Sequence, residues 1–102
     1  MVKVIKLEDV EYELIKNYKD GYDEELLKNK YTDYFEPYDY IFGDFSYDQL
    51  RLKGFYEHNN PSVNKNNDIE ILDNYIINYC AYDCRYFLLK KKIEKVNKNS
   101  WN

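Results

Sequence analysis

Several residue types that would mark a specialised protein are scarce in this chain of 102 residues. Two cysteines and one histidine offer few ligands for a metal, and they exclude a disulfide-stapled secreted scaffold. Three isolated glycines cannot build a glycine-rich phosphate loop. No run approaches the roughly 20 apolar residues that span a bilayer, and the N-terminus lacks a signal-peptide block. We therefore expect a cytoplasmic protein with no membrane contact, no cofactor and no bound metal.

Tyrosine is abundant instead, with 13 of the 102 residues. Hydrophobic residues make up 44% of the chain and charged residues 33%, a balance typical of a globular protein. The length predicts one compact domain over residues 1–91, followed by a basic polar tail over residues 92–102. A tyrosine ring can fill the edge of a small core or form a stacking surface, and the first role is the commoner.

Alternating and helical patterns predict an α+β domain with the order β-β-α-β-β-α-β. The expected strands cover residues 2–7, 10–18, 38–44, 49–57 and 85–91, and the expected helices cover residues 23–35 and 69–80. Asp23 is a good helix N-cap, and Pro37 ends the first helix. The apolar run at residues 86–89 predicts a central strand buried on both faces. We expect a mostly antiparallel sheet with both helices on one of its faces.

Three stretches of the chain resemble the YutD-like family of small bacterial proteins. They are residues 18–25 (YKDGYDEE), residues 38–56 (YDYIFGDF, then QLRLKGFY) and residues 72–87, which include Tyr79-Cys80 and Cys84-Arg85. The resemblance implies a compact α+β domain but no established activity.

The chain departs from the family pattern at the turn of the predicted hairpin. Phe45 stands where tryptophan is usual, and Ser46 and Asp48 stand where glycines are usual. A turn that relies on glycine at a positive φ must therefore be made here by Asp48 or be rearranged. The residues expected to shape the turn structurally are Gly43, Asp44 and Gly54.

Basic residues are concentrated at the end of the chain. The whole chain has a formal net charge of −4, but residues 85–102 contain six lysines and arginines against a single glutamate. Since charges are screened within about 8 Å at physiological salt, a partner at this end would meet a basic surface.

A basic sheet face predicts the leading function, a non-enzymatic module that contacts RNA or a ribonucleoprotein. On a strand, Gln49, Arg51 and Lys53 point to one side. Cations among aromatic rings on a sheet are an arrangement used by single-strand RNA binders. The candidate residues are Tyr40, Tyr47, Gln49, Arg51, Lys53, Lys90 and Lys92.

The sequence leaves other interpretations open. Arg51 can instead pair with Asp44 or Asp48 across the hairpin, and lysines at a chain end often only solubilise. A tyrosine-rich acidic surface also suits a protein–protein adaptor or regulator.

A carboxylate-dependent hydrolase or nuclease is the least favoured alternative. It would need several of the hairpin acids in one pocket with a metal. These acids are Asp39, Asp44, Asp48 and Glu57.

The remaining chemistry-bearing residues give weak signals. Cys80 and Cys84 can be core residues, a redox pair or half of a shared metal site. His58 lies at a loop start with no motif around it, so we expect it to be solvated rather than catalytic.

Overall fold

The computed structural model of this chain describes residues 3–79 and 84–92. Along the chain, its elements are β1 (Lys3–Leu7), β2 (Val10–Tyr18), α1 (Glu24–Lys30), β3 (Tyr40–Ser46), β4 (Gln49–Phe55), α2 (Leu72–Tyr79) and β5 (Tyr86–Lys91). Two single turns of 3₁₀ helix, η1 (Asp33–Phe35) and η2 (Ile69–Ile71), precede β3 and α2. The α+β class and the predicted element order are therefore confirmed.

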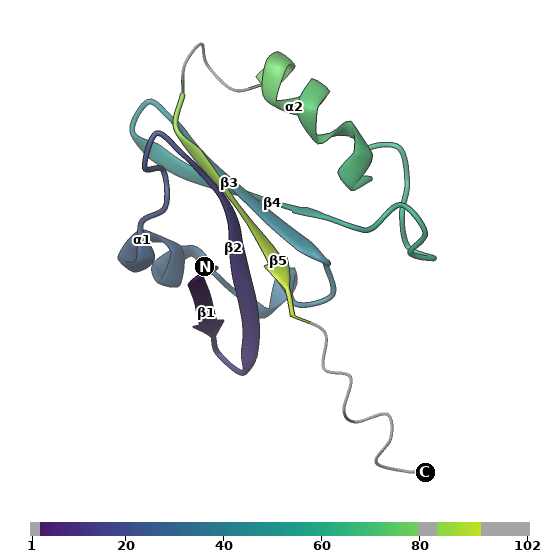
Figure 1. Ribbon diagram of the computed structural model, residues 1–102, viewed down its shortest axis with the longest axis horizontal. Coiled ribbons are helices and arrows are strands. Elements are labelled where there is room, and N and C mark those ends of the chain that lie inside the picture. Colours follow the sequence, from purple (N-terminus) through teal and green to yellow (C-terminus); the bar gives the residue numbers. More distant parts are fainter. Residues whose placement is uncertain (1–2, 80–83, 93–102) are drawn as a thin grey trace.

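The strands described form one antiparallel sheet in the spatial order β1-β2-β5-β3-β4 (Figure 1). The last strand of the sequence therefore lies in the middle of the sheet, as its apolar run predicts. Phe87, Leu88 and Leu89 are all buried there. Within the described residues, β1 and β4 are the two edges of the sheet.

The two faces of the sheet carry separate hydrophobic clusters. Side chains alternate along β5, so Phe87 and Leu89 join one cluster and Leu88 joins the other. Leu27 of α1 is fully buried in the first cluster, whereas Leu72 of α2 belongs to the second. The helices consequently cover opposite faces (Figure 1).

The expectation that both helices share one face is therefore wrong. A strand whose side chains are buried on both sides needs cover on both sides of the sheet. With one helix available for each face, α1 packs over the part of the sheet that includes β1, and α2 packs over β3, β4 and β5.

Local signals set the start of α1 but not its end. The carboxylate of Asp23 accepts from the backbone N–H of Leu26 at 3.1 Å, which confirms this residue as the N-cap. The helix stops at Lys30, five residues before the predicted end. Thr32 then caps η1, so the segment before Pro37 turns as a separate 3₁₀ helix.

The hairpin between β3 and β4 has a two-residue turn formed by Tyr47 and Asp48. Both residues have a positive φ, 53° and 63°. This geometry matches the twist of the flanking strands, and it normally favours asparagine and glycine. Asp48 makes half of the turn, as the departure from the family pattern predicts.

Gly43, Asp44 and Gly54 do not shape the turn, because all three lie inside β3 or β4. A Cβ atom at Gly43 would approach the ring of Phe87 to 2.3 Å, and one at Gly54 would approach the ring of Tyr38 equally closely. The glycines therefore leave room for aromatic rings that lie directly over the strand backbone.

Two predictions reach residues that the structure does not describe. The helix ending at Cys80 is confirmed only as far as Tyr79. Residues 93–102 of the predicted tail lie outside the described part of the chain, so the division at residue 92 stays a prediction. None of the helices described is long and apolar enough to cross a membrane.

Candidate binding groove beside strand β4

Most of the residues predicted to form a basic sheet face lie on the same face of the sheet, and α2 covers part of that face. The strand register places Arg51 opposite Asp44 and Lys53 opposite Phe42, whose ring belongs to the cluster beneath α2. Register partners project to the same side of a sheet. The predicted residues on this side are Tyr40, Gln49, Arg51, Lys53 and Lys90.

Arg51 is held by a bidentate ion pair. Its Nε donates to Asp44 Oδ1 at 3.1 Å, and its second guanidinium nitrogen donates to Asp44 Oδ2 at 2.6 Å. The same nitrogen donates to the backbone carbonyl of Tyr79 in α2 at 3.1 Å. Hydrogen bonding to Asp44 raises the pKa of the Arg51 guanidinium. Because Asp44 is only 2% exposed, this guanidinium serves a buried carboxylate rather than an external anion.

The lysines near the end of β5 also have acidic neighbours. Lys90 lies 3.7 Å from Glu57, which accepts a hydrogen bond from the hydroxyl of Tyr40 at 3.2 Å. Burial, followed by the nearby Glu57, raises the pKa of Tyr40 to about 12. Lys92 lies 3.7 Å from Glu11. These partners reduce the positive field that the sequence predicts at this end.

Lys53 differs from these three cations. Its ammonium lies 5.2 Å from the ring centroid of Phe55 and 5.7 Å from that of Tyr75. No carboxylate of the described residues lies within ion-pair distance of it. A cation over two rings and without a counter-ion can still receive an anionic group.

Tyr47 lies at the tip of the hairpin, and Gln49 begins β4 two residues before Arg51. Tyr47 is 98% exposed and is held by its place in the turn, not by packing. The predicted residues therefore do not form one continuous cationic and aromatic surface.

The hairpin carboxylates each have a structural role. Asp39 Oδ2 accepts from the backbone N–H of Glu57 at 2.8 Å and from the amide of Asn60 at 3.0 Å. Asp44 binds Arg51, and Asp48 lies in the turn. Among the residues described, these acids do not form a group that could hold a metal.

A different trio brings possible metal ligands together. The ligand atoms of His58, Asp68 and Glu70 lie within 4.8 Å of one another. His58 Nδ1 lies 2.6 Å from Asp68 Oδ2, and this hydrogen bond raises the pKa of the imidazole. We interpret the trio as a structural ion pair between His58 and Asp68, with Glu70 close to His58. This pair fastens the loop after β4 to η2. Cys84 lies before β5, and Cys80 lies outside the described residues.

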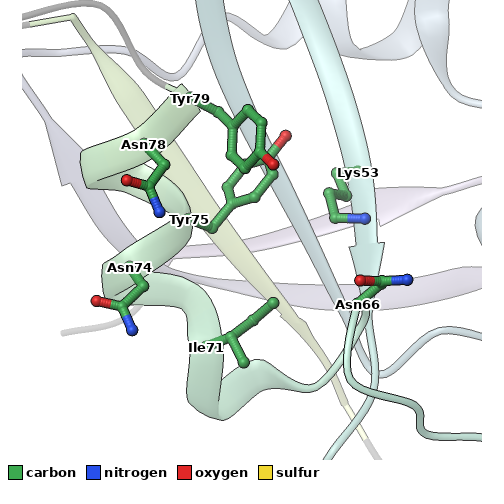
Figure 2. A pocket seen from close by; sticks show the side chains of 7 residues that line it. All are labelled: Lys53, Asn66, Ile71, Asn74, Tyr75, Asn78 and Tyr79. Atoms are coloured by element: carbon green, nitrogen blue, oxygen red, sulfur yellow. The ribbon is translucent and has the colours of Figure 1, made fainter.

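Two adjoining cavities border β4, and sequence analysis missed them. One, of about 370 Å³, lies between β4 and α2 and is lined by Lys53, Asn66, Tyr75 and Tyr79 among others (Figure 2). The second, of about 450 Å³, shares the first three of these residues and extends to Tyr34 and Tyr38. We call the two cavities together the β4 groove.

Tyr34 and Tyr38 line one side of the β4 groove, and their ring contacts continue to Tyr56 outside the groove lining. Tyr34 contacts Tyr38 at a centroid distance of 5.8 Å, and Tyr38 contacts Tyr56 at 4.7 Å. Tyr34 is 64% exposed, and its hydroxyl lies 3.3 Å from that of Tyr38. This hydrogen bond raises the pKa of Tyr38 to about 12. No described lysine or arginine lies over these three rings.

The opposite wall comes from the asparagine-rich loop between β4 and η2. Asn64, Asn66 and Asn67 line the groove, and the side chain of Asn64 accepts from the backbone N–H groups of Asn66 and Asn67. The loop is visible in the sequence as a cluster of asparagines. Its approach to Lys53 is not, because that contact depends on how the loop returns along β4.

Comparison with known proteins places this fold among its relatives. A family model described as "Putative antitoxin YutD-like" matches residues 6–90. The chain belongs to the YutD-like family. The resemblance seen in the sequence is therefore confirmed.

Two matches within the YutD-like family, a sequence and a solved structure that both carry the name YutD of B. subtilis, cover most of the chain. "Putative antitoxin YutD" of Bacillus subtilis (strain 168) is 46% identical over 88 residues, which are 86% of this chain and 97% of that protein. The solution NMR structure of protein yutD from B. subtilis matches with a TM-score of 0.76 and 43% identity. That match covers 90% of this chain and 84% of the other. The YutD-like fold is thus seen in an experimental structure of a relative.

Proposed function

We propose that this chain is a cytoplasmic protein-binding module that neutralises a partner protein, as an antitoxin does. Its membership of a family described as putative antitoxins supports this proposal, as does its similarity to a relative of the same description. Neutralising a toxin by binding needs an accessible surface on the module and no catalytic group.

The single observation that carries the proposal is the β4 groove. It combines exposed tyrosine rings, side-chain amides and one cation without a carboxylate partner among the described residues. Tyrosine supplies a large contact area at a low cost in side-chain entropy, and it is enriched at protein interfaces. Such a surface suits a protein better than a polyanion.

RNA remains the second candidate, but the charge pattern gives it less support. A phosphate backbone is bound by several accessible lysines and arginines acting together. Here Arg51, Lys90 and Lys92 each lie beside a carboxylate of the same chain. An RNA would have to displace these partners before it could use the cations.

The test uses the full chain as bait. Proteins captured from lysate with and without nuclease are identified, and each is then expressed with and without this chain. We expect a captured protein that slows growth alone and no longer does so with the chain. Capture that disappears after nuclease treatment, or the absence of any growth rescue, would contradict the proposal.

Two tyrosine variants provide a matched comparison. Tyr34→Ser removes an exposed ring from the groove wall, whereas Tyr47→Ser removes an exposed ring from the hairpin tip. We expect growth rescue to weaken with Tyr34→Ser and to persist with Tyr47→Ser. Equal rescue by both variants would show that the groove is not the contact surface.

A further inference from the structure

The outer side of β4 has no strand partner between Leu52 and Gly54, where Leu52 is half-buried and Gly54 is buried. No other strand of the described chain lies on that side. The backbone N–H and C=O of Tyr56 bond outward, to Asn67 and Ile69 respectively. Because peptide groups alternate in direction along a strand, those of Leu52 and Gly54 also point outward. No backbone hydrogen bond joins them to another described residue on that side.

The β4 groove opens directly onto this edge. Leu52, Lys53 and Gly54 line it, with Tyr38 on one face of the sheet and Tyr75 on the other. The asparagine loop lines the same groove beside them. Exposed strand edges are usually shortened, covered or blocked, because they invite pairing with another chain. Here the edge instead lies along the β4 groove.

We propose that the partner docks by adding an extended segment to the outer edge of β4, with acidic side chains facing Lys53. This inference rests on the proposed protein-binding function and names the site and the partner's chemistry. Strand addition supplies main-chain hydrogen bonds for affinity, and alternate side chains supply specificity.

The chain already pairs in this way at the end of the groove. The segment around Asp68 forms a parallel bridge with Tyr56, and it makes both of its backbone hydrogen bonds to that residue. A partner strand beside Leu52 and Gly54 would continue this pairing along β4. The β4 groove thus follows the part of this edge that has no strand partner, and the far end of the edge is occupied.

The charge of Lys53 favours a partner segment with acidic side chains. Lys53 lies on the α2 side of β4, so alternate side chains of an added strand would meet it and Arg51. Carboxylates there would supply the counter-ion that Lys53 lacks among the described residues. A second copy of this chain, paired through its own β4, would bring basic residues rather than carboxylates to Lys53, and facing like charges are destabilising.

The test uses an acetylated and amidated peptide of sequence Thr-Val-Glu-Val-Glu-Val-Thr and amide hydrogen exchange measured by NMR. We expect the peptide to slow exchange at Leu52, whose N–H points outward. The amide of Lys53 provides an internal control, since it already faces β3 and should not change. The same peptide with lysine in place of glutamate should not bind.

A matched pair of charge reversals tests the role of Lys53. Lys53→Glu should lower the affinity of the protein for the glutamate peptide about tenfold, as expected for the loss of one charge-assisted contact. Lys65→Glu makes the same change in net charge outside the groove lining and should leave affinity unchanged. If Lys53→Glu does not fold, Lys53→Gln replaces it.

Each contrary outcome has a distinct meaning. Unchanged exchange at Leu52 with millimolar glutamate peptide overturns the inference, even where the chain still neutralises a partner. Slower exchange at Leu52 with rising protein concentration and no peptide would assign the edge to a second copy. Peptide binding without any neutralised partner would sustain the edge site and contradict the proposed function.

Discussion

At the scale of single residues, the Arg51–Asp44 pair offers the sharpest test of how this sheet face is stabilised. Asp44 is almost fully buried, whereas the Arg51 side chain is 44% exposed. Removing the guanidinium in Arg51→Leu leaves a buried carboxylate without its bidentate donor. We expect the free energy of unfolding to fall by about 1–3 kcal/mol, measured by urea denaturation.

A double-mutant cycle separates the pair from its surroundings. Arg51→Leu combined with Asp44→Leu should lose less stability than the two single changes added together, because neither charge is then left alone. Additive losses would mean that the pair is not coupled. Lys53→Leu, on the same strand, serves as a control that leaves the pair intact.

The His58–Asp68 pair predicts a specific pH dependence. Hydrogen bonding to Asp68 raises the pKa of His58 above its ordinary value of 6.5. The pKa of Asp68 is lowered, first by the backbone N–H of Glu70 and then by His58. A raised histidine pKa gives stability that is complete below 6.5 and is lost as pH rises through the folded value. Stability from the lowered Asp68 pKa is lost as pH falls through that value.

An NMR titration of the imidazole measures this directly, because the chain has one histidine. We expect a midpoint above 6.5 that moves down in Asp68→Asn, which retains the helix-capping ability of the side chain. Glu24→Gln removes a carboxylate that pairs with Lys28 and should leave the midpoint unchanged. A wild-type midpoint at or below 6.5 would contradict the pair.

At the scale of elements, the β3–β4 hairpin carries backbone conformations that its residues do not favour. Tyr47 and Asp48 both adopt a positive φ. Replacing them with asparagine and glycine should stabilise the protein by about 1 kcal/mol, because these residues suit this turn. Thermal unfolding would then shift upward by about 4–8 °C.

The opposite change provides the control for the hairpin. Tyr47→Val also removes the ring, which is 98% exposed, but a β-branched residue at positive φ should lower the melting temperature. If both variants shift the temperature in the same direction, loss of the ring rather than the turn is responsible.

The elements were more predictable than their packing. Alternation of apolar and polar residues predicts β1, β2 and the hairpin, since burial of one strand face imposes period two. The placement of both helices on one face was wrong, although the run from Tyr86 to Leu89 already requires cover on both faces. The amphipathic pattern of a helix identifies its buried side but not the face of the sheet that receives it.

At the scale of the whole molecule, sequence analysis predicted which residues are charged but not which charges meet. The Arg51–Asp44 pair was foreseeable as a cross-strand contact within one hairpin. The partners of Lys90 and Lys92 were not, because Glu57 and Glu11 are far away in the sequence and approach only when β5 inserts into the sheet. The β4 groove was missed for the same reason, since its walls come from separate segments.

The central position of β5 predicts how the whole domain unfolds. It joins the β1–β2 pair to the β3–β4 pair, and it contributes to the clusters under both helices. Leu89 is fully buried, so Leu89→Ala should lower the free energy of unfolding by about 2–5 kcal/mol. Because the two halves are held by one strand, hydrogen exchange should accelerate equally in β2 and β3.

The control is Val4→Ala on edge strand β1, where the side chain is 48% exposed and little change in the free energy of unfolding is expected. If Leu89→Ala accelerated exchange in only one half, the sheet would consist of two units that open independently.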